Sequence, residues 1–310
     1  MPLYLTEADV ATLFEPGDAV AIVEDSLRRT AAGEVVIQPR LRLPLEDGAL
    51  ALMGAVDRGL GVAGVKTYAA ARGNSAFVVV LFDAARASQL GVIEADELGR
   101  LRTGAASAVA ARYLARAGAS RLGIVGCGFQ AETQVACIRA AVPTIEHVVA
   151  YCRREESLDS FCARVGAEPA ETASEAVAEA DVVVTVTTSK DPVLRGDWLP
   201  DGAIVCGVGA NHPSRRELDD AVLSRATFVC CDALEQARLE SGDLIEPVAH
   251  GILDWLEVHE LHEVVSGEVA GRASEDDVVV FKSNGLASWD VAIGVAALER
   301  AREFGVGREV

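Results

Sequence analysis

The chain has 310 residues, of which half are hydrophobic, and its 47 acidic and 28 basic residues give a net charge of −19. This length allows two domains with a well-buried core, and the abundance of Ala, Val, Leu and Gly is typical of an α/β protein. The negative charge argues against nucleic acid or an anionic membrane surface as a partner. An anionic ligand must therefore be held by local cations or by backbone amides.

Seven cysteines show no C-x-x-C spacing, and several lie in apolar runs, as at Ile204–Val208 and Phe228–Cys231. This usage predicts reduced thiols and a cytoplasmic protein. The first ten residues lack the basic start and apolar core of a signal peptide, so we expect none. No apolar run is long enough for a membrane helix.

In chain order, the first predicted elements are two helices, one capped at Thr6 and one starting at Asp18 and ending before Gly33. Strand-like runs follow, and Thr103 is then predicted to cap a helix over Thr103–Ala117. The strand-like runs are Val35–Leu43, Val62–Ala69 and Phe77–Asp83.

From Arg121 the pattern changes to buried strands that alternate with helices, which predicts a parallel sheet. The interruption at Gly118–Ser120 marks the expected domain boundary. The predicted strands are Arg121–Gly126, His147–Cys152, Asp181–Thr187, Ala203–Gly209, Phe228–Asp232 and Val278–Lys282.

The segment Gly126–Ala131, GCGFQA, directly follows the first of these strands and opens a helix. This is the G-x-G-x-x-G/A fingerprint in the setting that dinucleotide binding requires. Gly126 permits a tight turn, and Gly128 lets the backbone approach a pyrophosphate. Amides at the helix N-terminus, where Phe129 and Gln130 lie, bind the anion. The alternative is a glycine turn in another kind of α/β domain.

The fingerprint, with a second strand at the right distance, favours a Rossmann NAD(P)-binding domain over residues 119–285. The remaining residues, 1–118 and 286–310, are predicted to form a second, α+β domain. The C-terminal helix Trp289–Phe304 is expected to complete that second domain. The predicted fold class is therefore α/β with two domains.

The end of the second strand distinguishes the two nicotinamide cofactors. NAD sites usually carry an acid there for the ribose 2′-hydroxyl, whereas this chain has Arg153 and Arg154, with no acid before Glu155. Guanidinium groups form bidentate hydrogen bonds with phosphate, so the pair favours NADP(H) over NAD(H). The alternative is a solvated pair of arginines at the start of the next helix.

Hydroxyl side chains follow the third strand, at Thr187, Thr188 and Ser189. Ligands bind at the carboxyl edge of open parallel sheets, so we expect these residues to contact the cofactor, together with Val208 on the next strand. Isolated hydroxyls are otherwise more often turn residues.

A further signal comes from a set of segments that are spread in order along nearly the whole chain, at residues 38–40, 64–66, 101–107, 126–131, 187–191, 209–217 and 281–285. Together, and in this order, they resemble the ornithine cyclodeaminase/μ-crystallin family. The resemblance implies a bound nicotinamide cofactor and a homodimer whose first domain supplies substrate groups and a β-sheet interface. Members of the family include lyases that cyclise ornithine, NADPH-dependent reductases of cyclic imino acids, an alanine dehydrogenase type and a thyroid-hormone-binding crystallin.

Arg40, Lys66 and Arg102 match the cationic positions that hold the substrate carboxylate in this family. Strand alternation also allows Arg40 to be one of an exposed pair with Arg42. A half-buried lysine without a partner is uncommon, and a displaced pKa would make Lys66 a proton donor or acceptor. Arg102 precedes the predicted helix start, a poor place for a cation unless an anion binds there. Thr103 is expected to contact the cofactor.

The chain departs from the ornithine cyclodeaminases at Asn211, where the resemblance places an aspartate that serves the distal amino group of the substrate. Asparagine can bind a substrate but cannot take a proton at neutral pH, which argues against ornithine cyclisation. His212 beside it is a less favoured acid or base, since a loop histidine is more often simply exposed. A second departure is the short stretch Ala69–Ala76, where the family generally has a longer loop.

No metal site is expected. The segment His259–His262 reads H-E-x-H and lacks the H-E-x-x-H spacing of zinc helices. Asp232 and Asp243 are interpreted as structural residues at strand and helix ends.

Together these features favour an NADPH-dependent reductase of a small imino or keto acid, with pyrroline-2-carboxylate as the best single substrate. Arg40, Arg102 and Lys66 would hold the carboxylate, and Lys66, or water held by Asn211 or His212, would protonate the nitrogen. Two alternatives stay open: a cyclodeaminase-type lyase with catalytic NAD, and an NADPH-gated binding protein of the μ-crystallin kind.

Overall fold

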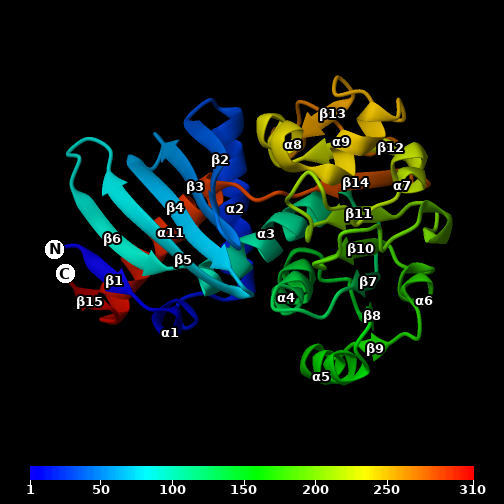
Figure 1. Ribbon diagram of the computed structural model, residues 1–310, viewed down its shortest axis with the longest axis horizontal. Coiled ribbons are helices and arrows are strands. Elements are labelled where there is room, and N and C mark those ends of the chain that lie inside the picture. The colour runs from blue at the N-terminus through cyan, green and yellow to red at the C-terminus, as the bar shows by residue number, and fades with distance from the viewer. The chain divides into compact units, whose positions relative to one another are not determined.

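The computed structural model describes all 310 residues, which divide into two compact units. The first unit comprises residues 1–102 and 286–310, and the second comprises residues 103–285 (Figure 1). The α/β class predicted from the sequence is confirmed, since one sheet is mixed and the other is entirely parallel. The division falls inside helix α3 (Asp96–Leu114), before the boundary expected at Gly118.

A seven-stranded mixed sheet forms the first unit, with the order β15-β1-β6-β5-β4-β3-β2. Strands β2 to β6 are antiparallel neighbours, β1 runs parallel to β6, and β15 pairs antiparallel with β1. The strands are β1 (Leu3–Leu5), β2 (Val35–Leu45), β3 (Gly48–Asp57), β4 (Val62–Ala71), β5 (Asn74–Asp83), β6 (Gln89–Glu94) and β15 (Arg308–Glu309).

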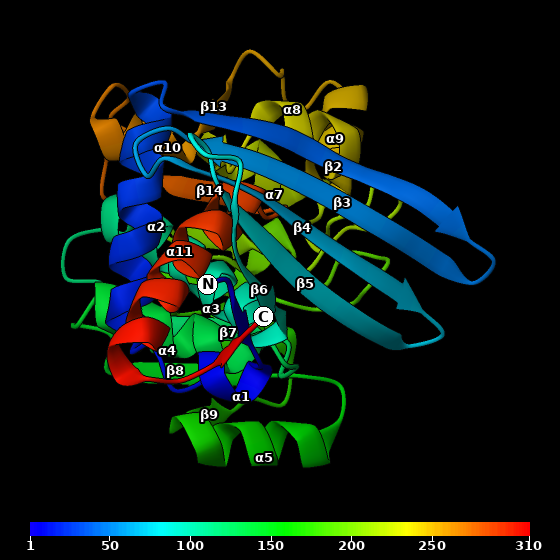
Figure 2. The same cartoon turned by 90° about the vertical axis from the view of Figure 1, so that its left-hand side faces the viewer.

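Helices α2 (Pro16–Ala31) and α11 (Ala287–Phe304) pack on one face of this sheet, as Figure 2 shows. The packing is close, because a Cβ at Gly64 of β4 would lie 2.6 Å from a methyl carbon of Val291 in α11. The last helix of the chain therefore belongs to the first unit. A short helix, α1 (Glu7–Val10), precedes α2.

Helix α3 begins at Asp96, so the prediction that Thr103 caps a helix is wrong. The cap comes from Glu7, whose two carboxylate oxygens accept hydrogen bonds from the amides of Asp96 and Glu97 at 2.7 and 2.8 Å. Sequence patterns identify a capping Ser, Thr, Asp or Asn only next to the start of a helix, whereas Glu7 lies far from Asp96 in the sequence. Arg102 consequently lies within the helix and not before it.

The second unit is built on an eight-stranded parallel sheet, with the order β13-β12-β14-β11-β10-β7-β8-β9. The chain turns from β7 toward β8 on one side and later toward β10 on the other, which creates the switch point where such sheets bind ligands. The strands are β7 (Arg121–Val125), β8 (His147–Tyr151), β9 (Glu168–Pro169), β10 (Val182–Thr185), β11 (Ile204–Gly207), β12 (Ala226–Cys231), β13 (Val258–Glu260) and β14 (Val278–Lys282).

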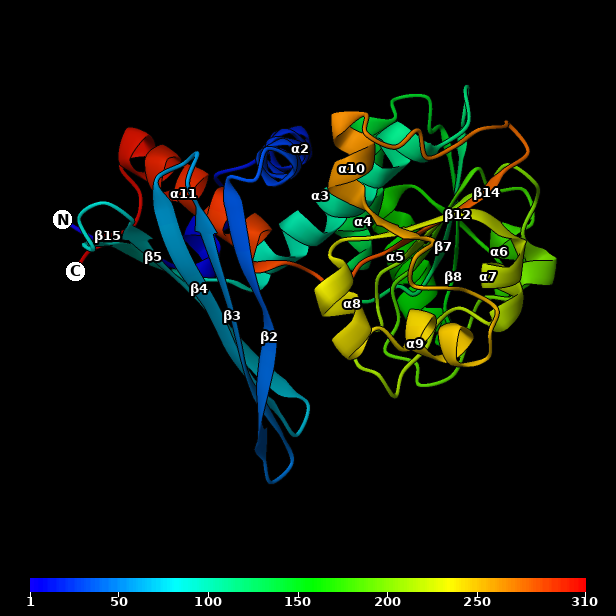
Figure 3. The same cartoon turned by 90° about the horizontal axis from the view of Figure 1, so that it is seen from above.

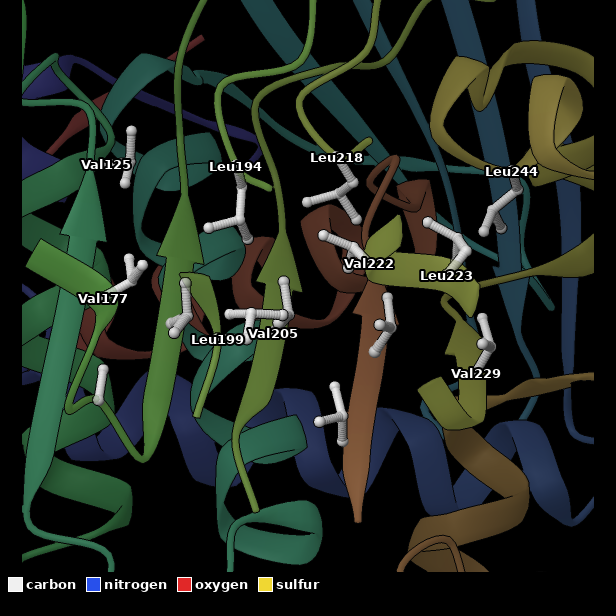
Figure 4. Close-up of a cluster of buried hydrophobic side chains, with 14 of the residues drawn as sticks. Val125, Val177, Leu194, Leu199, Val205, Leu218, Val222, Leu223, Val229 and Leu244 are labelled. Carbon is white, nitrogen blue, oxygen red and sulfur yellow. The ribbon is translucent and has the colours of Figure 1, made fainter. Parts of the chain in front are cut away.

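Helices cover both faces of this sheet (Figure 3). On one face, valine and leucine side chains of the strands and helices form a continuous core, in which Val205 and Val229 lie with Val177, Val222 and Leu244 (Figure 4). Such nearly continuous apolar strands are expected of a sheet buried on both sides. The helices of the unit, besides α3, are α4 (Ala131–Ala141), α5 (Glu155–Val165), α6 (Ala173–Val177), η1 (Gly196–Trp198), α7 (Asp220–Arg225), α8 (Leu234–Glu240), α9 (Gly242–Ala249) and α10 (Leu261–Ser266).

Candidate active site

A cluster of charged side chains is buried inside the first unit. Lys66 of β4 is 3% exposed, and its Nζ lies 2.7 Å from Oδ1 of Asp290 in α11. The same carboxylate oxygen lies 3.4 Å from Nε of Arg102. Arg40 is buried as well, with its Nε 3.2 Å from the sulfur of Met53, which pairs with Lys66 across β3 and β4. The structure thus brings together the three cations that the sequence placed at the substrate.

In this cluster, Lys66 and Arg102 contact one fully buried carboxylate, and Arg40 lies near enough to Lys66 to lower its pKa. Cationic side chains gathered at one buried place favour the binding of a small anion beside them. Arginine is suited to a planar carboxylate, because its guanidinium group can form two parallel hydrogen bonds with it. The arrangement is therefore suited to a small carboxylic acid.

The proton affinity of Lys66 is altered by this environment. Burial is the largest cause that lowers its pKa, to about 8; Arg102 and Arg40 lower it further, and Asp290 opposes the shift. At neutral pH the ammonium form still predominates, yet it loses its proton far more readily than an exposed lysine. Lys66 therefore suits a proton donor near neutral pH.

Local features of the backbone position these groups. The pairing of β2 with β3 shifts register between Gln38 and Leu41, and this bulge accompanies burial of both Pro39 and Arg40. In α3, a Cβ at Gly99 would lie only 2.9 Å from Nζ of Lys66. Bulges commonly redirect a side chain next to a functional site. The stretch that the sequence singled out as short is a tight hairpin, with positive φ at Arg72 and Gly73.

The fingerprint loop of the second unit joins β7 to α4. Gly126 has a φ of +116°, and a Cβ there would lie 2.6 Å from the carbonyl oxygen of Val186. A Cβ at Gly128 would meet no atom within 4 Å, so the backbone is open to close approach. No side chain caps α4, which follows Gln130. An open glycine edge and an uncapped helix N-terminus fit a dinucleotide pyrophosphate.

Four more residues were predicted to contact the cofactor, two in the fingerprint loop itself and two soon after β8. Phe129 is 52% exposed, and the side-chain oxygen of Gln130 is buried without a hydrogen-bond partner. Arg153 and Arg154 follow β8, and both are exposed. Arg154 is the N-cap residue of α5. Because both side chains are exposed, the fold allows either interpretation of the pair: contact with a phosphate, or solvation at the start of α5.

A buried carboxylate holds the loops that follow β10 and β11. Oε1 of Glu217 accepts hydrogen bonds from the amide and hydroxyl of Thr187 at 2.6 and 2.8 Å. Its other oxygen accepts from the Thr185 hydroxyl and from the amides of Gly209 and Ala210. Burial, the largest cause, raises the pKa of Glu217. Two loops at the carboxyl edge of the sheet are thereby tied to one side chain.

The sequence-predicted residues of these loops have different surroundings. The hydroxyl of Thr187 is engaged by Glu217, and Ser189 donates to the carbonyl oxygen of Asp191 at 2.8 Å. Thr188 and Asn211 are exposed, and Val208 is half-buried. His212 lies on the same loop as Asn211, with its Nδ1 2.8 Å from the Ser214 hydroxyl. Thr103, which is the first residue of the second unit, is buried within α3.

Four residues that were predicted to have no metal-binding or catalytic role contact neighbouring groups of the fold. His259 and His262 each lie beside a glutamate, at 3.2 and 3.1 Å, and no group of three or more His, Cys, Asp or Glu is arranged to hold a metal ion. Oδ2 of Asp232 accepts the amides of Asn284 and Gly285, and Oδ1 of Asp243 accepts those of Glu217 and Leu218. None of the helices has the length and apolarity that crossing a membrane requires.

Three buried charged residues escaped the sequence reasoning: Asp290, Glu217 and Lys282. Lys282 pairs with Asp243 at 3.2 Å and donates to the carbonyl oxygens of Gly207 and Ala210. A signal existed for Asp290, which is an acid within the apolar run Trp289–Val295 of the last helix. Acids are rarely buried without a partner, so its position predicted a cation nearby.

Known proteins resemble this chain in both sequence and structure. A model of the ornithine cyclodeaminase/mu-crystallin family matches residues 2–304. The chain belongs to this family. The Delta(1)-pyrroline-2-carboxylate reductase of Bacillus cereus is 35% identical over 306 residues, which cover 94% of this chain and 93% of that one.

Solved structures agree with this assignment. The Delta(1)-pyrroline-2-carboxylate reductase of Thermococcus litoralis, in complex with NADH and L-proline, superposes with a TM-score of 0.93 at 28% identity, over 99% of this chain and all of that one. An archaeal alanine dehydrogenase dimer with bound NAD gives 0.93 at 33% identity, over 100% and 98% of the two chains. This member of the ornithine cyclodeaminase/mu-crystallin family is an NAD(P)-dependent oxidoreductase.

Proposed function

We propose that this family member is an NADPH-dependent reductase of small imino or keto acids, with pyrroline-2-carboxylate as its best single substrate. The observation that carries the proposal is the buried cluster of Arg40, Lys66 and Arg102, in which Asp290 contacts Lys66 and Arg102. It combines a positive site for a carboxylate with a lysine whose pKa is lowered to about 8. Relatives named as reductases of this imino acid support the choice of substrate.

In the proposed mechanism, Arg40 and Arg102 hold the substrate carboxylate, and Lys66 protonates the imine nitrogen. A nicotinamide cofactor held by the proposed contacts of the second unit would supply the hydride for the reduction. Asp290 keeps the Lys66 ammonium in place and supports its charge. Fixing the acid and the proton donor in one site removes much of the entropic cost of bringing them together. The first unit thus binds the acid in this proposal, and the second binds the cofactor.

The proposed cofactor contacts are the fingerprint residues Gly126–Gln130, the hydroxyl loop Thr187–Ser189, and the single residues Thr103 and Val208. Asn211 is proposed to bind the substrate and not to act as a base, which disfavours the lyase reaction.

Turnover of pyrroline-2-carboxylate tests the function directly. NADPH oxidation by the purified chain is followed with pyrroline-2-carboxylate, with piperideine-2-carboxylate, and with pyruvate plus ammonia. We expect the cyclic imino acids to be reduced fastest. Faster turnover of pyruvate plus ammonia would overturn the cyclic substrate in favour of alanine formation. Release of ammonia from ornithine, with no net change in NAD(P), would instead support the lyase alternative.

We also propose that Arg153 and Arg154 bind the 2′-phosphate of NADPH. A hydrogen bond to a charged group contributes about 1.5 to 3 kcal/mol, so the double variant Arg153→Ala/Arg154→Ala should weaken NADPH binding at least about 10-fold. The affinity for NADH, which lacks the phosphate, should stay unchanged. The control is Arg164→Ala, an exposed arginine within α5 that pairs with Glu132. Equal losses for both cofactors in titrations of intrinsic fluorescence would contradict this assignment.

A homodimer is proposed as well. The face of the mixed sheet opposite α11 carries a row of paired apolar residues, Val36, Val56, Ala63 and Phe82, of which three are 36–49% exposed. Leu41, Leu43 and Leu45 continue this exposed face along β2. Apolar surfaces of this extent mark interaction sites, and one relative is a dimer. A monomer in sedimentation equilibrium at micromolar concentration would exclude this proposal.

A further inference from the structure

Two thiols lie together at the carboxyl edge of the parallel sheet. Cys127 stands between the two glycines of the fingerprint loop, and Cys152 is the first residue after β8. Burial and the neighbouring Cys152 raise the pKa of the Cys127 thiol, so the two side chains lie close together. Both are partly exposed, whereas the other five cysteines of the chain are buried. Cys127 and Cys152 are therefore the accessible thiols, and they are neighbours.

The backbone supports a close approach of these two residues. Strands β7 and β8 are parallel neighbours up to Val125 and Tyr151, and the amide of Gly126 donates to the carbonyl oxygen of Tyr151 at 2.8 Å. Adjacent strands are about 4.8 Å apart, and disulfides join Cα atoms about 4.4 to 6.8 Å apart. Glycines on both sides of Cys127 give its backbone the freedom to adjust.

We propose that Cys127 and Cys152 are a redox modification site, which a peroxide oxidises to a reversible disulfide that blocks the dinucleotide loop. The effect on the cofactor rests on the proposed contacts of residues 126–130. A disulfide would tie this loop to the end of β8 and remove the open backbone edge at Gly128. Oxidation would thus turn off cofactor binding, and a thiol reductant would restore it.

The chemistry needs one peroxide for each disulfide. The Cys152 thiolate attacks a peroxide oxygen, the O–O bond breaks, and a sulfenic acid and water are formed. The Cys127 thiol then attacks this sulfur, loses its proton, and displaces the hydroxyl group as a second water. Both sulfurs are oxidised and both peroxide oxygens are reduced. Cys127 suits the second role, because it lies beside the end of β8 and the glycines on both sides of it leave its backbone free to adjust.

The remaining cysteines provide an internal comparison. Cys137 and Cys206 are fully buried, so a peroxide should reach neither thiol. Cys162 of α5 is also buried, and burial, Asp159 and the nearby Cys152 raise the pKa of its thiol. It is the competing partner for Cys152, which makes the identity of the cross-link the decisive observation.

The test uses the reduced 310-residue chain, treated with hydrogen peroxide with and without saturating NADPH. We expect loss of two free thiols, a Cys127–Cys152 cross-linked peptide by mass spectrometry, and at least a 10-fold weaker NADPH affinity that dithiothreitol reverses. Bound NADPH should protect the thiols. The Cys152→Ser variant should bind NADPH normally and resist peroxide, whereas Cys137→Ser should behave as the wild type.

A Cys152–Cys162 cross-link, retention of all thiols, or a cross-linked chain with unchanged NADPH affinity would each overturn the proposal. None of these measurements uses an imino acid. They therefore stand apart from the proposed reductase activity, whose failure would leave the cross-link and the affinities unchanged.

Discussion

Replacing Lys66 by methionine is expected to lower kcat/KM for the imino acid by about 10²- to 10⁴-fold, the usual contribution of a general acid. Methionine has a similar length and suits a buried site, and Asp290 keeps Arg102 as a partner. Folding should therefore be retained, while the proton donor is lost. The measurement is steady-state NADPH oxidation, with NADPH affinity and the melting temperature determined in parallel.

The pH dependence separates proton donation from simple charge. In the wild type, kcat/KM should fall as pH rises through about 8, because the donor form of Lys66 is the protonated one and its pKa is lowered to about 8. This fall should be absent from the residual activity of Lys66→Met. The control variant Arg58→Met changes an exposed cation of the same unit and should match the wild type. An unchanged pH profile in Lys66→Met would assign the proton to another group.

Much of the second unit could be predicted because its signals are local. A buried strand, the GCGFQA turn and a helix are adjacent in the sequence, and the parallel sheet follows from their alternation. The first unit was harder. Strands β3 and β6 were missed, since the Ala- and Gly-rich run Gly48–Asp57 has no strong strand propensity of its own. Its structure depends on pairing with both neighbours, which is a tertiary effect.

The candidate site shows the same limit. The family resemblance identified Arg40, Lys66 and Arg102, yet Asp290, which contacts two of them, lies 188 residues or more away in the sequence. Pairing between distant side chains leaves no local pattern. Glu217 is a similar case, because its role depends on loops from two other strands. The one signal available in the sequence was a single acidic residue in an apolar helix or after a strand. Such a residue indicates that a partner exists, but not which residue the partner is.

Replacing Asp290 by asparagine is expected to destabilise the fold by about 3 to 5 kcal/mol, because the buried cations lose their carboxylate. Asparagine preserves the shape and can still accept a hydrogen bond from Lys66. Without the charge of Asp290, which opposes the shift, the pKa of Lys66 should fall below its wild-type value of about 8. The fall of kcat/KM with pH should therefore move to lower pH. Denaturant unfolding and a pH–rate series measure the two effects.

The double variant Lys66→Met/Asp290→Asn decides whether these effects arise from the pair. It removes one cation together with the carboxylate, so it should be more stable than Asp290→Asn alone and show a positive coupling in a double-mutant cycle.

Titration of Lys66 also makes the stability of the fold depend on pH. A lysine whose folded pKa of about 8 lies below the unfolded value of 10.5 makes the wild type more stable as pH rises between them. This window should widen in Asp290→Asn and close in Lys66→Met. Additive effects of the two substitutions, with parallel stability profiles, would mean that Asp290 and Lys66 act separately and that the 2.7 Å contact has no part in setting the proton donor.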